Sequence, residues 1–87
     1  MIKVTLQNTL DELGITRNKL AVEAKIRPAT LHSLVKGQAT QIKFDTLSSL
    51  LNALNDMALV KGADKIYTIT DIIDYEYGNG DGRRATY

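Results

Sequence analysis

The sequence predicts a mainly α-helical single domain of four to five short helices, with an N-terminal strand that pairs with a C-terminal strand. Apolar residues spaced three and four positions apart, as on one face of a helix, recur from Leu6 to Leu54. An alternation of apolar and polar residues, which is typical of a half-buried strand, occurs at positions 2–6. The length of 87 residues fits one compact domain and is too short for a catalytic cleft between two lobes.

The first two expected elements are a strand and the helix that follows it. The period of two at positions 2–6 predicts a strand of about five residues. Leucines then follow at spacings of four and three, which predicts a helix over positions 6–13. Thr5 is its expected N-cap and Gly14 its expected C-terminal stop.

Two further helices, separated by a short turn, are expected between Thr16 and Gly37. Thr16 can cap the first of them, and its inward side consists of small and apolar residues, Leu20, Ala21 and Ala24. Pro28 fits the first turn of the second helix, because its missing N–H is not needed there and its fixed φ is already helical. Gly37 ends this helix after Lys36.

A fourth helix and a less regular C-terminal part follow. Asp45 can cap the fourth helix, whose apolar stripe consists of four leucines, Leu47, Leu50, Leu51 and Leu54. The helical pattern weakens from Asn55 onward. The remaining chain combines a β-rich run at 66–69, a single helical turn capped by Thr70 and a second extended run at 75–77. One of the extended runs is expected to pair with the N-terminal strand, which would otherwise lack a partner.

These elements are expected to form one domain over residues 1–77, with a helical core at 6–55. Residues 78–87 begin with the polar, glycine-rich run GNGDGRR, which predicts a flexible tail. The sequence contains no internal repeat.

The composition excludes several kinds of site. The chain has no cysteine, so disulfides and thiolate ligands are impossible, and with His32 as its one histidine a metal site would depend almost wholly on carboxylates. No metal or other cofactor is therefore expected. The longest apolar runs are far shorter than the roughly 20 residues of a membrane span, and the N-terminus lacks the apolar core of a signal peptide. These features predict a cytoplasmic protein without membrane contact.

Charge is segregated along the chain, although the net charge is only +1. Within positions 16–43 a single acid, Glu23, stands among six cations, Arg17, Lys19, Lys25, Arg27, Lys36 and Lys43. Within positions 45–81 seven acids face only Lys61 and Lys65. Such segregation favours one surface for a polyanion and another that avoids it, the alternative being two solvated surfaces that differ by chance.

Residues 16–37 combine two short helices with a turn of about four residues, which is the arrangement of a helix-turn-helix unit. Small or apolar residues and a final glycine stand where such a unit needs them, at Ala21, Ile26, Leu31, Leu34 and Gly37. With a helix before it and the run FDTLSSLLNAL after it, this segment resembles the Cro-type, lambda-repressor-like helix-turn-helix family of bacterial and phage regulators, also called the xenobiotic-response-element family. The resemblance extends over about positions 6–54, more than half of the chain.

Two features depart from the pattern of that family. The family usually has glycine in the turn, where φ is positive, whereas this sequence has Lys25 at a cost of about 1 kcal/mol. Residues 55–69 look like an insertion in a region where family members often finish with a short fifth helix. The resemblance therefore says little about the oligomer.

The resemblance implies a sequence-specific regulator of transcription that binds double-stranded DNA, with repression as the expected activity. Helix 3 of such a domain, here about residues 28–36, would lie in the major groove, and helix 2 would lie across the backbone. We expect a homodimer, because one helix in one groove buries too little surface for a unique genomic address. The candidates for the dimer contact are residues 55–69 and the N-terminal strand.

The expected DNA contacts divide into phosphate contacts and base contacts. Reach and charge assign phosphate contacts to Lys36 and Lys43, and the resemblance adds Arg17 at the start of helix 2. Pro28 and Ala29 can touch thymine methyl groups. The alternatives are ordinary solvated cations and, for Pro28, a role confined to starting the helix.

Four polar residues complete the expected interface. Thr30 and Ser33 offer hydroxyl groups to base edges. His32 can reach a base or a phosphate, or it can be a surface histidine without a role. Arg27 can read guanine with two hydrogen bonds, although its position directly before a proline leaves its direction open.

Two other functions stay open at the level of sequence. An antitoxin would use the same motif on its own promoter and bind a toxin through its C-terminal part. A protein-interaction module without DNA binding would hold a partner through the acidic C-terminal half, which carries Tyr67, Tyr75 and Tyr77. An enzyme is disfavoured and no catalytic residue is expected, because no nucleophile and carboxylate accompany His32 and no glycine-rich phosphate loop follows a strand.

Overall fold

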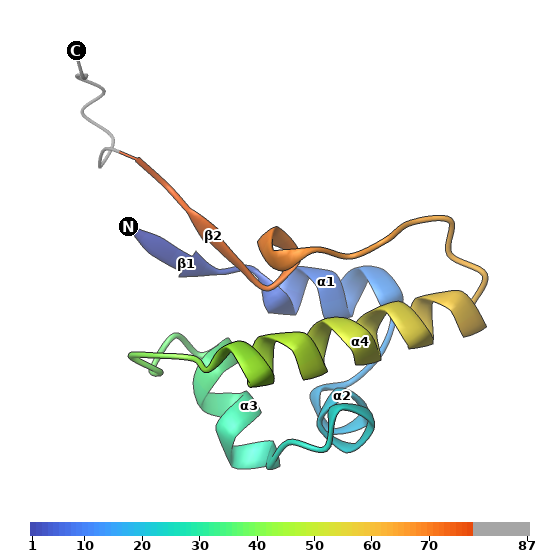
Figure 1. The fold of residues 1–87 in the computed structure, drawn as a ribbon, viewed down its shortest axis with the longest axis horizontal. Helices are drawn as coiled ribbons and strands as arrows, with labels where there is room; N and C mark the ends of the chain where they lie inside the picture. Colours follow the sequence, from blue (N-terminus) through green and yellow to red (C-terminus); the bar gives the residue numbers. More distant parts are fainter. Residues whose placement is uncertain (78–87) are drawn as a thin grey trace.

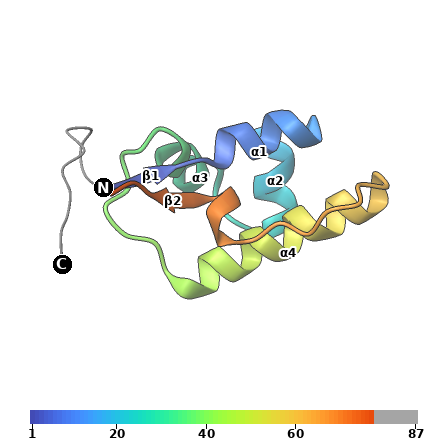
Figure 2. The ribbon, with the colours of Figure 1, turned by 90° about the horizontal axis from the view of Figure 1, so that it is seen from above.

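The computed structural model describes residues 1–77, in which a long central helix separates two short helices from a third helix and a small sheet. In chain order the elements are β1 (Ile2–Val4), α1 (Leu6–Leu13), α2 (Arg17–Ala24), α3 (Pro28–Val35), α4 (Phe44–Val60), the 3₁₀ turn η1 (Ile69–Asp71) and β2 (Ile73–Tyr75). In Figure 1, α4 crosses the molecule with α2 and α3 below it and α1 and both strands above it. Figure 2 shows the same elements from above. The mainly helical fold class is confirmed, and the predicted tail lies outside the described residues.

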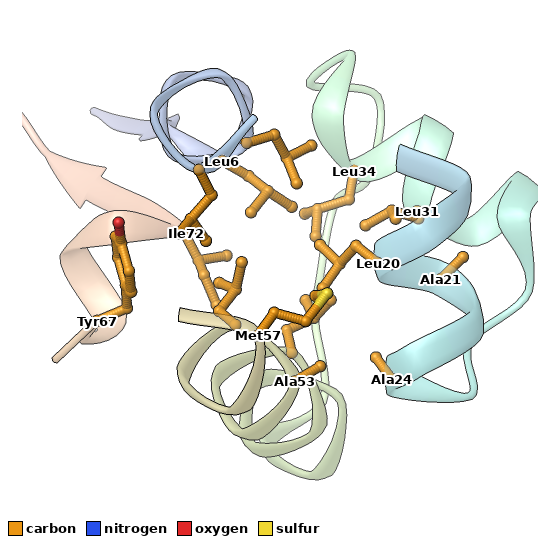
Figure 3. Close-up of a cluster of buried hydrophobic side chains, with 14 of the residues drawn as sticks. Leu6, Leu20, Ala21, Ala24, Leu31, Leu34, Ala53, Met57, Tyr67 and Ile72 are labelled. Atoms are coloured by element: carbon orange, nitrogen blue, oxygen red, sulfur yellow. The ribbon is translucent and has the colours of Figure 1, made fainter. Parts of the chain in front are cut away.

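One hydrophobic core joins all four helices to the C-terminal segment (Figure 3). The largest side chains with almost no exposed surface are six leucines and one isoleucine, Leu6, Leu10, Leu20, Leu31, Leu50, Leu54 and Ile72. The leucines predicted to face inward from the helical spacing are all in this core or at its edge. Because α4 lies in the middle and packs on α2, its position fixes the α2–α3 pair relative to α1 and the sheet.

The first helix has its predicted bounds and its predicted N-cap residue, Thr5, but the Thr5 side chain makes no capping hydrogen bond. Thr5 stands at the N-cap position, yet its hydroxyl donates to the carbonyl of Thr70 at 2.8 Å instead of accepting from α1. One turn further on, the hydroxyl of Thr9, a residue only 3% exposed, donates to the carbonyl of Asp71 at 2.7 Å. Both threonines thus join α1 to η1. Gly14, with φ +70°, ends the helix as predicted.

The fourth helix begins earlier and ends later than its sequence pattern indicated. Lys43 is its N-cap and Asp45 lies inside its first turn, so the prediction of Asp45 as the cap is wrong. An acid within the first turn still interacts favourably with the positive end of the helix dipole. The helix continues to Val60, because Met57 and Ala58 bury their side chains in the core. The first part of the segment that looked like an insertion is therefore a continuation of α4.

The return from α4 to the sheet is mostly irregular. The β-rich run predicted at 66–69 forms no strand, and the single helical turn, η1, is capped by Thr68 and not by Thr70. The amide of Thr68 donates to Asp71 Oδ2 at 2.9 Å, which closes a capping box around the turn. Thr70 lies inside the turn, where its carbonyl accepts from Thr5.

The two strands form an antiparallel sheet, as predicted for the N-terminal strand and one C-terminal run. In its register Ile2 lies opposite Tyr75, and Val4 lies opposite Ile73. Strand β2 begins two positions before the run predicted at 75–77, and β1 has three residues where about five were expected. Directly before β2, Ile72 is fully buried, so the sheet is attached to the core through its inner end.

Candidate nucleic-acid interface

A residue in the left-handed conformation forms the turn between α2 and α3. Lys25 has φ 59° and ψ 45°, a conformation that costs a residue with a Cβ more than it costs glycine. Within residues 1–77 no other non-glycine residue has a positive φ. The amide of Lys25 donates to the carbonyl of Val22 at 3.2 Å, and that of Ile26 donates to the carbonyl of Ala21 at 2.9 Å. Lys25 therefore adopts the positive φ at the position where the family usually has glycine, as expected from the sequence.

The packing of α3 decides which of its side chains face outward. Leu31 and Leu34 are 1% and 7% exposed and hold the helix against the core. Pro28 lies in its first turn, as the sequence indicated, and Arg27 is its N-cap. The side chains left at the surface are mostly small or polar: Pro28, Ala29, Thr30, His32 and Lys36 are exposed, and Ser33 is half-buried. The outward face predicted from the helical spacing is confirmed.

Arg17 joins three helices at the edge of this face. Its Nε donates to Oε1 of Gln7 in α1 at 2.9 Å, and its Nη1 lies 2.9 Å from Nδ1 of His32 in α3. Gln7 is itself fixed, because its Nε2 donates to Asp11 Oδ1 at 2.9 Å. Arg17 is the first residue of α2 and is half-buried, so its guanidinium is held at the start of that helix beside α3.

Two shallow hollows flank α3 and divide the predicted site residues between them. The hollow on the side of α2 is lined by Thr16, Arg17, Asn18, Pro28, Ala29 and His32. The hollow on the side of α4 includes Thr30 and Lys43. The structure thus brings Arg17, Pro28, Ala29 and His32 together, whereas Thr30 and Lys43 meet on the other side of the helix.

Three predicted site residues lie outside both hollows. Arg27 precedes α3 and Lys36 follows it, so these two cations stand at opposite ends of the helix. Lys36 lines a groove that also includes β1 and the loop between α3 and α4. Ser33 is half-buried on the second turn of α3.

Most cations of the basic segment have no acidic partner within residues 1–77. The exception is Lys19, whose Nζ lies 3.2 Å from Glu23 Oε2 one turn along α2. The cations without an ion pair in this part of the chain are Arg17, Lys25, Arg27, Lys36 and Lys43. An uncompensated set of this kind around one short helix provides a positive surface that can attract phosphate groups.

The two side chains with shifted pKa values belong to the return segment and not to α3. The hydrogen bond from Lys65 to Glu12 raises the pKa of Lys65. Burial raises the pKa of Tyr67, whose ring lies 4.8 Å below the Lys65 ammonium. Both contacts stabilise the segment that returns from α4 along α1.

Sequence reasoning missed Gln7 and the contact between Arg17 and His32. No periodic pattern links α1 to the start of α2, because the distance between them depends on how the helices cross. The sequence did indicate that His32 lies on the same face of α3 as Pro28, because the two residues are one helical turn apart.

Further observations limit the kinds of site in the described part of the chain. No helix there has both the length and the apolar character needed to cross a membrane. Residues 1–77 also contain no cluster of three or more side chains suited to holding a metal ion.

Comparison with known proteins adds one match. Residues 5–55 match the family profile of the Cro/C1-type HTH DNA-binding domain. The match includes α1, α2, α3 and most of α4, and it ends before the return segment and β2. No curated protein and no solved structure matches the chain significantly.

Proposed function

Because the chain belongs to the family of Cro/C1-type helix-turn-helix DNA-binding domains, we propose that it is a repressor that binds a specific duplex operator through α3. Membership of the family makes it a DNA-binding regulator of transcription. The observation that supports the finer proposal is the outward face of α3. Leu31 and Leu34 hold this face in place, and the cations around it have no acidic partner within the described residues 1–77. In this docking α3 lies in the major groove and α2 lies across the backbone.

The proposed phosphate contacts come from three cations at separate places around α3. Arg17 sits at the N-terminal end of α2, where backbone N–H groups and the helix dipole also favour a phosphate. Lys36 follows α3, and Lys43 precedes α4. Three such points would fix the orientation of α3 on the duplex without reading its sequence.

The proposed base contacts come from the first two turns of α3. Pro28 and Ala29 offer apolar surface to thymine methyl groups, and Thr30 and Ser33 offer hydroxyl groups. Arg27, at the N-cap, is the candidate for a bidentate contact with guanine.

We further propose that the regulator acts as a homodimer. Leu59, Val60 and Ile66 are 78%, 87% and 79% exposed, and they lie at the end of α4 and in the return segment. Figures 1 and 2 show this end of α4 at the far end of the molecule from α3, so a contact there would leave the DNA-binding face open. An antitoxin would use the same apolar surface for a toxin, and co-purification of a toxin with the chain would distinguish it from a regulator that only dimerises.

Selection of bound duplexes from a random DNA pool tests the proposed function. A single consensus should be enriched by the wild-type chain, and inverted repeats within it would report two half-sites. The double variant Arg17→Ala, Lys36→Ala is the control and should enrich nothing at the same salt concentration. Transcription in vitro from a promoter that overlaps the selected site should then decrease when the protein is added. No enrichment by the folded wild-type chain, or increased transcription, would contradict the proposal.

A further inference from the structure

The contact between Arg17 and His32 determines which ring nitrogen of His32 carries hydrogen. We propose that Arg17 holds His32 as the Nε2–H tautomer and that this N–H reads N7 of a purine in the operator. The inference rests on the proposed function, since it assigns a specificity-determining role to one residue of the same face. Sequence patterns gave His32 no defined role beyond a contact with a base or a phosphate.

The tautomer follows from the chemistry of the two partners. An arginine side chain remains protonated in proteins and has only hydrogen-bond donors. Nη1 of Arg17 lies 2.9 Å from Nδ1 of His32, so Nδ1 must accept and cannot carry hydrogen. In a neutral imidazole the hydrogen then resides on Nε2. His32 therefore presents a donor, and not an acceptor, on the far side of its ring.

Arg17 is hydrogen-bonded to α1 as well as to α3. Its Nε is occupied by Gln7 Oε1 at 2.9 Å, and Gln7 is fixed by Asp11. The guanidinium plane is thus set by α1 before it meets the histidine of α3. Gln7 and Arg17 are positioning residues for His32.

The part of the hollow formed by α3 favours a base. There His32 lies beside Pro28 and Ala29, one turn earlier on the same face of α3. The side of the hollow formed by the start of α2 is lined by Thr16, Arg17 and Asn18. The apolar surfaces of Pro28 and Ala29 suit the edge of a base and offer nothing to a phosphate. Among residues 1–77, no acidic side chain lines this hollow to compete for the Nε2 hydrogen. In the major groove the acceptors for such a donor are N7 of both purines, O6 of guanine and O4 of thymine, whereas cytosine presents a donor. N7 is the acceptor that both purines share, and we assign the contact to it.

The first test measures the tautomer directly. His32 is the one histidine of the chain, so its two ring nitrogens give unambiguous resonances in a long-range ¹H–¹⁵N spectrum. In buffer alkaline enough for a neutral ring, Nε2 should show the shift of a protonated nitrogen and Nδ1 that of an unprotonated one. The variant Arg17→Met should move the Nδ1 shift toward that of a ring that exchanges between tautomers. A proton on Nδ1 in the wild type would overturn the proposal.

The second test identifies the acceptor. Each purine of the selected operator is replaced in turn by its 7-deaza analogue, which removes N7 and leaves Watson–Crick pairing intact. One replacement should weaken wild-type binding by about 3- to 10-fold, the effect of losing one hydrogen bond. The variant His32→Ala should bind the natural operator more weakly by a similar factor and should be insensitive to that replacement.

The outcomes separate this inference from the proposed function. If the wild type selects no operator, the proposed function fails and this inference with it. If an operator is selected but His32→Ala remains as sensitive as the wild type to every 7-deaza replacement, only the assignment of His32 fails. An equal loss by His32→Ala on the operator and on a scrambled duplex would identify a phosphate as the acceptor and would also overturn it.

Discussion

The side chain of Asn55 makes both backbone hydrogen bonds of Tyr67. The Tyr67 amide donates to Asn55 Oδ1 at 2.7 Å, and Asn55 Nδ2 donates to the Tyr67 carbonyl at 3.1 Å. The same Nδ2 also donates to the carbonyl of Leu51 within α4, at 3.0 Å. The Asn55 side chain therefore satisfies the backbone groups of Tyr67, which in a sheet would pair with a neighbouring strand. These bonds attach the irregular return segment to α4.

Asn55→Ala should lower the free energy of unfolding by about 1–3 kcal/mol, because it leaves the amide and carbonyl of a nearly buried residue without partners. Urea denaturation followed by circular dichroism measures the change. Asn52→Ala on the exposed side of α4 is the matched control and should change stability by less than about 0.5 kcal/mol. Equal effects of the two substitutions would show that the bridge to Tyr67 contributes little.

Lys25→Gly should raise the free energy of unfolding by about 0.5–1 kcal/mol, because glycine adopts the observed positive φ without a Cβ clash. Lys25→Ala removes the same charge and keeps the Cβ, so it should not gain stability. The difference between the two variants in urea denaturation isolates the backbone effect. A glycine variant no more stable than the alanine variant would be the contrary result.

Binding to duplex DNA should weaken steeply with salt. Arg17, Lys36 and Lys43, together with Lys25 or Arg27, would neutralise about 3–5 phosphates per subunit, which gives a log–log slope of about −2.7 to −4.5. Lys19 is paired with Glu23 and should contribute less. Fluorescence anisotropy over a series of salt concentrations measures the slope. A flat dependence would eliminate the electrostatic account of binding.

Residues that read bases should differ in kind from residues that contact phosphates. Thr30→Ala or Ser33→Ala should cost about 1–3 kcal/mol on the selected operator and little on a scrambled duplex. Lys36→Ala or Lys43→Ala should weaken both duplexes by a similar factor and make the salt slope shallower by about one unit. All four variants are measured on both duplexes at two salt concentrations.

The structure makes this comparison sharper, because Thr30 and Lys43 share one hollow. Thr30 is proposed to contact a base and Lys43 a phosphate. Because both line the same hollow, a difference between the effects of their substitutions does not come from different places on the DNA. Equal losses on both duplexes for the Thr30 and Ser33 variants would mean that the first two turns of α3 are not the reading element.

The isolated chain should form a dimer through the end of α4. Val60→Asp places a charge in the most exposed apolar position of that region and should shift sedimentation toward the monomer. Phe44→Asp is the control, since Phe44 is similarly exposed, at 85%, but lies at the other end of α4. A wild-type monomer, both free and on its operator, would rule the dimer out.

The helical half of the fold could be predicted because its signals are local. The ends of α1 and α2, the conformation of Lys25 and the start of α3 each depend on one or two residues whose backbone preferences are strong, such as Gly14 and Pro28. The predictions for Thr5 and Thr70 depended on contacts between distant positions. Thr5 stands at the expected N-cap position, but its hydroxyl meets the carbonyl of Thr70, 65 positions away, and Thr70 itself lies inside the turn that Thr68 caps.

The candidate site was predictable as a face and not as a set of contacts. Leu31 and Leu34 point inward, and this alone defines what α3 presents to solvent. That Arg17 meets His32, and that Thr30 shares a hollow with Lys43, depends on the angle between helices. Side-chain packing in the core sets that angle, and no short sequence pattern encodes it.

The strand pair has a consequence for the order in which the molecule opens. The pair of strands closes nearly the whole described chain into one loop, and the amide of Glu76 donates to the carbonyl of Met1. The contacts of α2 with α3, in contrast, join residues that are close in sequence. Contacts that close long loops form late during folding, and a short, exposed ladder is among the first to fluctuate. Amide hydrogens of β1 and β2 should therefore exchange through a partial opening that leaves α2, α3 and α4 protected. A molecule in which β1 and β2 have separated would still hold α3 in its position against α2 and α4.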